Sequence, residues 1–144
     1  MTNIPDTDWI FDIETYLDLF CVDITHVATR TRFIFEVSDR RDQSADFTAF
    51  CYWLQSIGAR MFGFNNEGFD YPVIHDLIRR GTFTALDAHR KGTSIIQSQD
   101  RFGTMVWPSD RLVMQGDLFK IHHFDNMARS TSLKKLEINM RANR

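Results

Sequence analysis

The first forty residues carry apolar and polar side chains in patterns typical of β-strands. Residues 8–15 form a largely apolar run that predicts a central strand, and residues 19–28 and 31–37 alternate well enough to predict two more. Thr29 to Thr31 supply a short turn between the second and third segments. We therefore expect a three-strand meander at the start of the fold.

Helical spacing of apolar residues begins after the third strand. Residues 46–57 repeat apolar side chains with a helical period, and Gly58 fits the C-terminal stop of that helix. A short strand is predicted over residues 59–64. A second helix is predicted over residues 70–80, with Gly81 at its end.

The pattern weakens in the second half of the chain. Residues 82–115 are interrupted by residues such as Gly92, and we expect a partly irregular segment with a short helix over residues 84–91. One more strand is predicted within residues 112–119, and a capped helix over residues 130–140. Strands followed by strand–helix alternation predict an α/β fold with a mixed sheet and flanking helices.

Composition fits one domain spanning residues 1–144. A chain of 144 residues with 43% apolar content can build one hydrophobic core. It contains no apolar run of about 18 residues, and its N-terminus lacks the order of a signal peptide, so we expect a soluble intracellular protein with no membrane partner. Cys21 and Cys51 lie in apolar patterns without ligand spacing, which predicts reduced thiols and no zinc site.

Charge does not by itself indicate a nucleic-acid partner. The net charge is −2, so any affinity for nucleic acid must come from local patches or metal-mediated contacts. The C-terminal part is more basic, and it is either a phosphate-facing strip or a solvated helix face. From residue 120 onward the basic residues are Lys120, Arg129, Lys134, Lys135, Arg141 and Arg144, against the acids Asp125 and Glu137.

Two carboxylates stand near the end of the first predicted strand. Successive side chains of a strand point to opposite faces, so Asp12 and Glu14 share one face while Phe11 and Ile13 share the other. Adjacent like charges repel, but Mg²⁺ and Mn²⁺ prefer carboxylate oxygens and would make the pair favourable. The pair therefore predicts a buried metal site; the alternative is an edge strand with two solvated acids.

A second cluster lies within residues 61–74. An apolar strand end leads into a loop with Asn65 and Asn66, which tolerate positive φ, and then into a helix with Asp70 as its N-cap and Pro72 in its first turn. Asp70 has the alternative of being a helix cap and nothing more. A cap does not account for the two phenylalanines and the paired asparagines in the same loop.

The two clusters together resemble the DEDD-type 3′-to-5′ exonucleases, in particular the proofreading exonuclease domains associated with DNA polymerases. Asp-Ile-Glu-Thr at residues 12–15 is similar to their first motif. Gly-Phe-Asn at residues 63–65, with Phe-Asp at residues 69–70 and Pro72, is similar to their second. Residues 131–137 resemble the Ser-Leu-Lys-x-Leu-Glu segment of the polymerase-type members.

The resemblance implies an RNase H-like fold and hydrolysis of a phosphodiester bond with two bound Mg²⁺ or Mn²⁺ ions. It also implies a single-stranded DNA 3′ end as substrate, a DNA polymerase polypeptide or domain as partner, and a location in the cytoplasm of a bacterial or phage-infected cell. Phe69 has the alternative role of ordinary core packing. The implied catalytic and metal-binding residues are Asp12, Glu14 and Asp70, and the implied substrate-binding residues are Thr15, Asn65 and Phe69.

The third motif of that family is absent. No tyrosine or histidine is followed by an aspartate at the spacing of Tyr-x-x-x-Asp or His-x-x-x-x-Asp. We therefore expect a domain that is incomplete at its C-terminal end, with weakened metal binding and slow or no turnover by this chain alone. Asp117 is a possible additional acid, with structural hydrogen bonding as its alternative role, and Asp125 and Glu137 are weaker candidates. His122 and His123 are expected to be a solvated pair.

Two other functions stay open at this point. The first is a non-catalytic nucleic-acid or protein-binding module that keeps the fold without the final motif. The second is a related 3′-to-5′ exoribonuclease.

Overall fold

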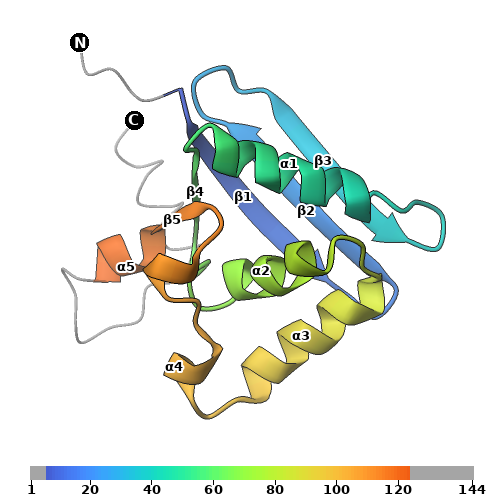
Figure 1. Cartoon of the computed structure of the whole chain (residues 1–144). Coiled ribbons are helices and arrows are strands. Elements are labelled where there is room, and N and C mark those ends of the chain that lie inside the picture. Colours follow the sequence, from blue (N-terminus) through green and yellow to red (C-terminus); the bar gives the residue numbers. More distant parts are fainter. Residues whose placement is uncertain (1–5, 124–144) are drawn as a thin grey trace, which may run out of the picture.

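The computed structural model describes residues 6–123, which form a five-stranded mixed sheet with flanking helices (Figure 1). The strand order is β3-β2-β1-β4-β5, with β1–β2 and β2–β3 antiparallel and β1–β4 and β4–β5 parallel. The predicted α/β fold is therefore confirmed. The strands are β1 (Asp8–Thr15), β2 (Leu19–His26), β3 (Arg32–Ser38), β4 (Arg60–Gly63) and β5 (Met114–Asp117).

The predicted three-strand meander is confirmed by the register of β1, β2 and β3. Asp12 lies opposite Asp23, and Asp23 lies opposite Ile34 on the next strand. Strand β2 is two residues shorter than predicted because the chain turns after His26, whose backbone N–H donates to the carbonyl of Thr31 at 2.8 Å.

The helices are close to those predicted in the first half of the chain and more extensive in the second. Gly58 and Gly81, with φ of 67° and 87°, follow α1 and α2 as predicted, because only glycine adopts positive φ without a steric cost. No helix among residues 6–123 is long and apolar enough to cross a membrane. The helices are α1 (Ser44–Ser56), α2 (Asp70–Arg80), α3 (Ala85–Gln97), α4 (Arg101–Thr104), the 3-10 helix η1 (Pro108–Asp110) and α5 (Leu118–His123).

Helix α3 is longer than the short helix predicted over residues 84–91. It begins with a capping box in which Thr84 and Asp87 exchange hydrogen bonds, and it continues through Gly92. A Cβ atom at Gly92 would lie 3.2 Å from Cζ of Phe69 and 3.3 Å from Oγ1 of Thr15. Gly92 therefore does not interrupt the helix. Its lack of a side chain allows α3 to approach the loop that precedes α2.

The strand predicted within residues 112–119 was too long. Strand β5 ends at Asp117, and the next residue begins α5. The reason is local, because Oδ1 of Asp117 accepts a hydrogen bond from the backbone N–H of Phe119 at 3.0 Å and so turns the chain into a helix. The predicted helix over residues 130–140 lies outside the described residues.

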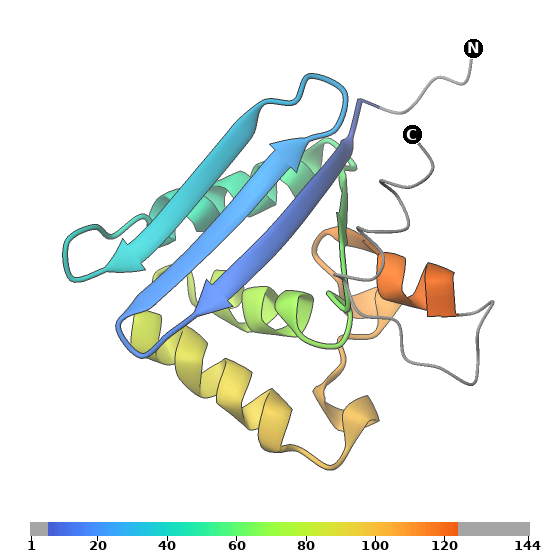
Figure 2. The same cartoon turned by 180° about the vertical axis from the view of Figure 1, so that it is seen from behind.

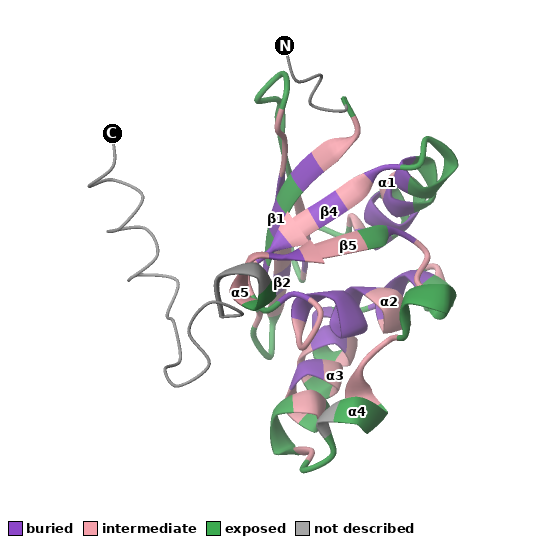
Figure 3. Ribbon diagram, turned by 90° about the vertical axis from the view of Figure 1, so that its left-hand side faces the viewer, coloured by how far each residue is buried: buried purple, intermediate pink, exposed green. Residues whose placement is uncertain are grey.

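The core lies between one face of the sheet and helices α1, α2 and α3. Trp9, Phe11 and Ile13 of β1 point to this side and are buried, and most of α2 is buried as well (Figure 3). Seen from behind, no described helix covers the other face of β1, β2 and β3 (Figure 2). Both cysteines are free, and burial raises the pKa of the Cys51 thiol.

Candidate active site at the ends of the parallel strands

The candidate residues gather where the parallel strands end. Asp12 and Glu14 lie in the last half of β1, Asn65 follows β4, and Asp117 ends β5. The central strand β1 has an antiparallel neighbour on one side and the parallel strands β4 and β5 on the other. In open α/β sheets, ligands bind outside the carboxyl ends of strands where the topology switches in this way.

Asp70 joins the second cluster to the first. It is the first residue of α2, and Phe69 occupies the N-cap position, so the predicted N-cap role of Asp70 is wrong. Its Oδ2 instead accepts a hydrogen bond from the backbone N–H of Ile13 at 3.3 Å. The paired register of β1 and β4 ends at Ile10 and Phe62, which leaves the N–H of Ile13 available to a side chain.

The electrostatics around Asp70 disfavour its negative charge. The residue is 8% exposed, and burial together with the charge of Asp12 raises the pKa of Asp70 to about 7. The pKa of Asp12 is also raised, first by partial burial and then by Glu14. Removing water from carboxylates that repel one another is costly, and a bound cation would offset that cost.

Asp12 and Glu14 do not form the buried site that the sequence predicted. Both are exposed, since they point to the uncovered face of the sheet, although β1 is a central strand and not an edge strand. Oε2 of Glu14 accepts a hydrogen bond from the hydroxyl of Tyr16 at 3.3 Å. Among residues 6–123, no group of three or more His, Cys, Asp or Glu side chains is arranged to hold a metal ion.

The chemistry of this site suits a hard divalent cation only with ligands from outside the protein. Mg²⁺ is commonly held by one or two carboxylates, with water and substrate phosphate completing its coordination. Asp12 and Asp70, whose charges interact, offer two such carboxylates. Such a pair could serve only a partly solvated ion, since residues 6–123 contain no group of three or more side chains arranged to hold a metal.

The loop between β4 and α2 has the backbone that the sequence predicted. Asn65 has a φ of 57°, and its carbonyl accepts hydrogen bonds from the N–H groups of Gly68 at 3.2 Å and Phe69 at 3.1 Å. Asparagine tolerates this left-handed conformation better than most residues. Asn66 is fully buried, and its amide donates to Oε1 of Gln115 on β5 at 2.9 Å.

Asp117 is the anchor of this loop. Its carboxylate accepts hydrogen bonds from the backbone N–H groups of Asn65 at 2.8 Å and Glu67 at 3.2 Å, in addition to Phe119 at 3.0 Å. The side chain is buried, and its charge contributes to the raised pKa of Asp70. Of the two roles considered for Asp117, structural hydrogen bonding is the one that the structure shows.

We predict that Asp117→Ala lowers the free energy of unfolding by about 2–4 kcal/mol, because it leaves three partly buried backbone N–H groups without their acceptor. Urea denaturation followed by circular dichroism measures the change. Asp18→Ala, at an exposed turn aspartate, is the matched control and should leave stability nearly unchanged. Unchanged stability combined with lost Mn²⁺ binding in Asp117→Ala would instead make this residue a ligand.

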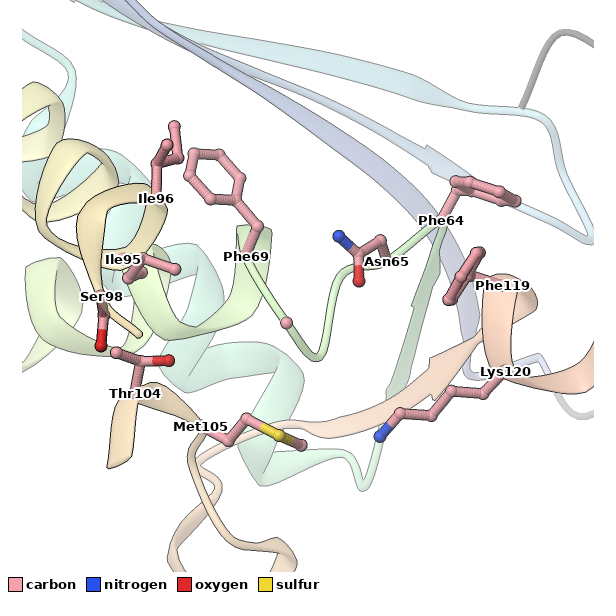
Figure 4. Close-up of a pocket in the computed structure, with 11 residues that line it drawn as sticks. Phe64, Asn65, Phe69, Ile95, Ile96, Ser98, Thr104, Met105, Phe119 and Lys120 are labelled. Carbon is pink, nitrogen blue, oxygen red and sulfur yellow. The ribbon is translucent and has the colours of Figure 1, made fainter. Parts of the chain in front are cut away.

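A cavity of about 580 Å³ opens beside the loop (Figure 4). Of the three residues implied to bind substrate, Asn65 and Phe69 line it, whereas Thr15 is not among its lining residues. Phe64 meets Phe119 edge-on, with ring centroids 5.4 Å apart. The remaining lining residues are Gly68, Ile95, Ile96, Ser98, Thr104, Met105 and Lys120.

Several residues that line the cavity were not predicted from the sequence, because they lie in the segment that was expected to be irregular. Ile95 and Ile96 lie in the last turn of α3, and Met105 follows α4. The sequence signal for these residues is the adjacent apolar pair at residues 95–96. Two neighbouring isoleucines are unusual in a polar loop and are better explained by the wall of a pocket. Thr15 lies near Phe69 through their shared proximity to Gly92.

Phe69 belongs both to the core and to the wall of the cavity. It is half-buried and packs against the hydrophobic core, and it also lines the cavity. The two roles are therefore compatible.

The mixed sheet with this strand order and its flanking helices is an α/β fold of the RNase H-like kind. Among solved structures, the fold is similar to the family B DNA polymerase from the hyperthermophilic archaeon Pyrobaculum calidifontis, with a TM-score of 0.52 and 19% sequence identity. The match covers 94% of this chain and 18% of that polymerase, so the chain spans less than a fifth of its length. No family model and no curated protein matches the chain.

Proposed function

We propose that this chain carries a metal-dependent 3′-to-5′ exonuclease of the proofreading type, which trims single-stranded DNA ends. The observation that carries the proposal is the hydrogen bond from the N–H of Ile13 to Asp70, which holds the second acidic cluster against the strand that bears Asp12. The similarity of the fold to part of a DNA polymerase supports it.

Different residues of the chain would hold the metal ion and position its ligands. Mg²⁺ or Mn²⁺, bound in the complete site as two ions, would supply a nucleophilic water and neutralise charge on the phosphate. Asp12 and Asp70 would hold the ion, with Glu14 beside them, and the N–H of Ile13 keeps the Asp70 carboxylate aligned. The exposed face around Asp12 leaves room for the scissile phosphate.

The cavity supports a nucleotide as substrate. Its volume of about 580 Å³ lies within the range typical of small-ligand sites. Phe64, Phe69 and Phe119 offer rings against which a base can stack, a contact worth about 1–3 kcal/mol and tolerant of sequence. Lys120, which pairs with Glu67, lies at the same cavity and can contact a phosphate.

We predict that Asn65→Gly raises KM for single-stranded DNA about tenfold and leaves kcat nearly unchanged, because the amide binds the strand end and takes no part in the chemistry. Glycine accepts the φ of 57° at this position, so the loop should keep its shape. The measurement is the rate of shortening of a 5′-labelled oligonucleotide over a range of chain concentrations in excess of it, whose half-saturating concentration and maximal rate stand for KM and kcat. A fall in kcat with constant KM would contradict a purely binding role.

The proposal is tested by incubating the chain with Mn²⁺ and 5′-labelled single-stranded DNA or RNA, and resolving the products on a sequencing gel. Progressive shortening of DNA from the 3′ end supports the proposal, and preferential shortening of RNA favours the exoribonuclease alternative. The missing third motif implies slow turnover, so enzyme is used in excess of substrate. Binding of DNA without shortening favours the non-catalytic module.

The wider setting of the activity is part of the same proposal. A DNA polymerase polypeptide or domain is the expected partner, since the fold is similar to part of such an enzyme. The expected location is the cytoplasm of a bacterial or phage-infected cell.

A further inference from the structure

Strand β3 forms one edge of the sheet, and its outer side is only partly closed. The N–H of Gln43 donates to the carbonyl of Glu36, the N–H of Glu36 donates to Oε1 of Gln43, both at 2.9 Å, and the N–H of Ser38 donates to the carbonyl of Arg41 at 2.7 Å. The connection after β3 therefore covers the outer side of its last residues. Figure 2 shows no other described element along the rest of that side.

The open stretch of this edge consists of Arg32 and Ile34. In an antiparallel pair, successive residues direct their N–H and C=O groups to alternate sides. Thr31 bonds inward to His26 of β2, and Glu36 bonds outward, so the even-numbered residues of β3 face away from the sheet. The main-chain groups of Arg32 and Ile34 thus present a short template for another strand.

Apolar side chains flank the open stretch on both faces of the sheet. Phe33 is 41% exposed and Ile34 is 54% exposed, on opposite sides of the strand. On the helix side, Phe33 packs beside Phe50, with ring centroids 5.5 Å apart, and Phe50 packs beside Trp53, which is 47% exposed. An open strand edge with apolar flanks is a template for pairing with another strand, and pairing would also bury these side chains.

We propose that β3 pairs with β3 of a second copy of this chain, antiparallel about a two-fold axis at Phe33. In this register the main-chain groups of Arg32 and Ile34 in each copy bond to those of Ile34 and Arg32 in the other. The two Phe33 rings meet on the helix side. Such a contact uses the same patch on both copies and closes at a dimer.

The geometry of the edge favours a second copy over a long foreign strand. The connection that covers Glu36 and Ser38 limits the template to a few residues, and a longer partner strand would collide with it. The strand of a second copy ends in its own turn at Arg30, where the backbone has a φ of 61°. In the proposed register this turn falls opposite Glu36 of the other copy, at the point where the connection begins to cover the edge.

Sedimentation velocity of the full chain over a range of concentrations tests the proposal. We expect a monomer–dimer equilibrium in the unsubstituted chain. Ile34→Lys should raise the dimer dissociation constant about tenfold or more, because it places a charge beside the pairing edge without touching the core. The matched control is Met114→Lys, on the opposite edge strand, where the methionine is 62% exposed and dimerisation should be unchanged.

Disulfide trapping tests the register. At the proposed two-fold axis, position 33 forms a non-hydrogen-bonded pair with Cα atoms about 4.5 Å apart, within reach of a disulfide. Phe33→Cys should therefore form a covalent dimer under mild oxidation, whereas Phe35→Cys and the unsubstituted chain should not. A monomer at every concentration would overturn the proposal and leave a strand of another protein as the occupant. A dimer that neither Ile34→Lys weakens nor Phe33→Cys traps would also overturn it.

Discussion

Asp12→Ala is expected to abolish Mn²⁺-dependent shortening of single-stranded DNA, lowering the rate by roughly a hundredfold or more. Asp12 lies on the exposed face of β1, beside Glu14 and within electrostatic reach of the buried Asp70. Removing it takes away the carboxylate that is proposed to share a divalent ion with Asp70. The rate of shortening on a 5′-labelled oligonucleotide, with enzyme in excess, is the measurement.

The matched control for this experiment is Asp23→Asn. Asp23 lies opposite Asp12 on the same sheet face, but its carboxylate is held by Arg32 at 2.9 Å. It should keep most of the activity, and both variants should keep the unfolding midpoint of the parent chain, because both side chains lie at the surface. Equal activity in Asp12→Ala and the parent chain would remove Asp12 from the site and attribute the shortening to another source.

Asp70→Asn is expected to lose the response to Mn²⁺ while making the metal-free protein more stable at pH 8. The pKa of Asp70 is raised to about 7 by burial and by Asp12, so its charged form is unfavourable in the folded state. A neutral amide removes that penalty and retains an oxygen that can accept from Ile13. We expect a gain in unfolding free energy on the order of 1–3 kcal/mol.

The sign of the pH dependence follows from proton linkage. Between its ordinary value near 3.8 and about 7, Asp70 binds a proton more readily in the folded than in the unfolded chain. Its contribution to the stability of the parent chain therefore falls as the pH rises through that window. The difference between Asp70→Asn and the parent chain should be small at pH 4 and largest at pH 8.

Thermal unfolding in EDTA at several pH values measures this difference, and the same scan with Mn²⁺ measures metal binding. Mn²⁺ should raise the Tm of the parent chain at pH 8 and should leave Asp70→Asn unchanged. Asp76→Asn is the control on the same helix, since Asp76 is only half-buried and pairs with Arg80. A less stable Asp70→Asn at pH 8 would contradict the unfavourable charge inferred for Asp70.

Asp70 thus resembles a functional group that is maintained at the expense of stability. A buried carboxylate near a second carboxylate lowers the stability of the metal-free fold at neutral pH, and a bound cation would restore it.

The sequence by itself determined the elements whose signals are local. Alternation placed β1 and separated Asp12 from Phe11 across the sheet, and Gly58 and Gly81 marked the ends of α1 and α2 through their positive φ. The meander also followed from the sequence, because short connections leave neighbouring strands few ways to pair.

Only the tertiary structure decided the features that depend on residues far apart in the chain. The local sequence predicts that Asp70 is a helix cap. In the structure the pairing of β1 with β4 stops before Ile13, so the N–H of Ile13 donates to Asp70, which lies 57 residues further along the chain. The local sequence predicts that Gly92 interrupts a helix. In the structure Gly92 lies within α3, and Phe69 and Thr15 occupy the space that a Cβ atom would need. Local sequence carries conformational preferences, whereas burial, long-range hydrogen bonds and the exposure of Asp12 arise from which surfaces the folded chain brings together.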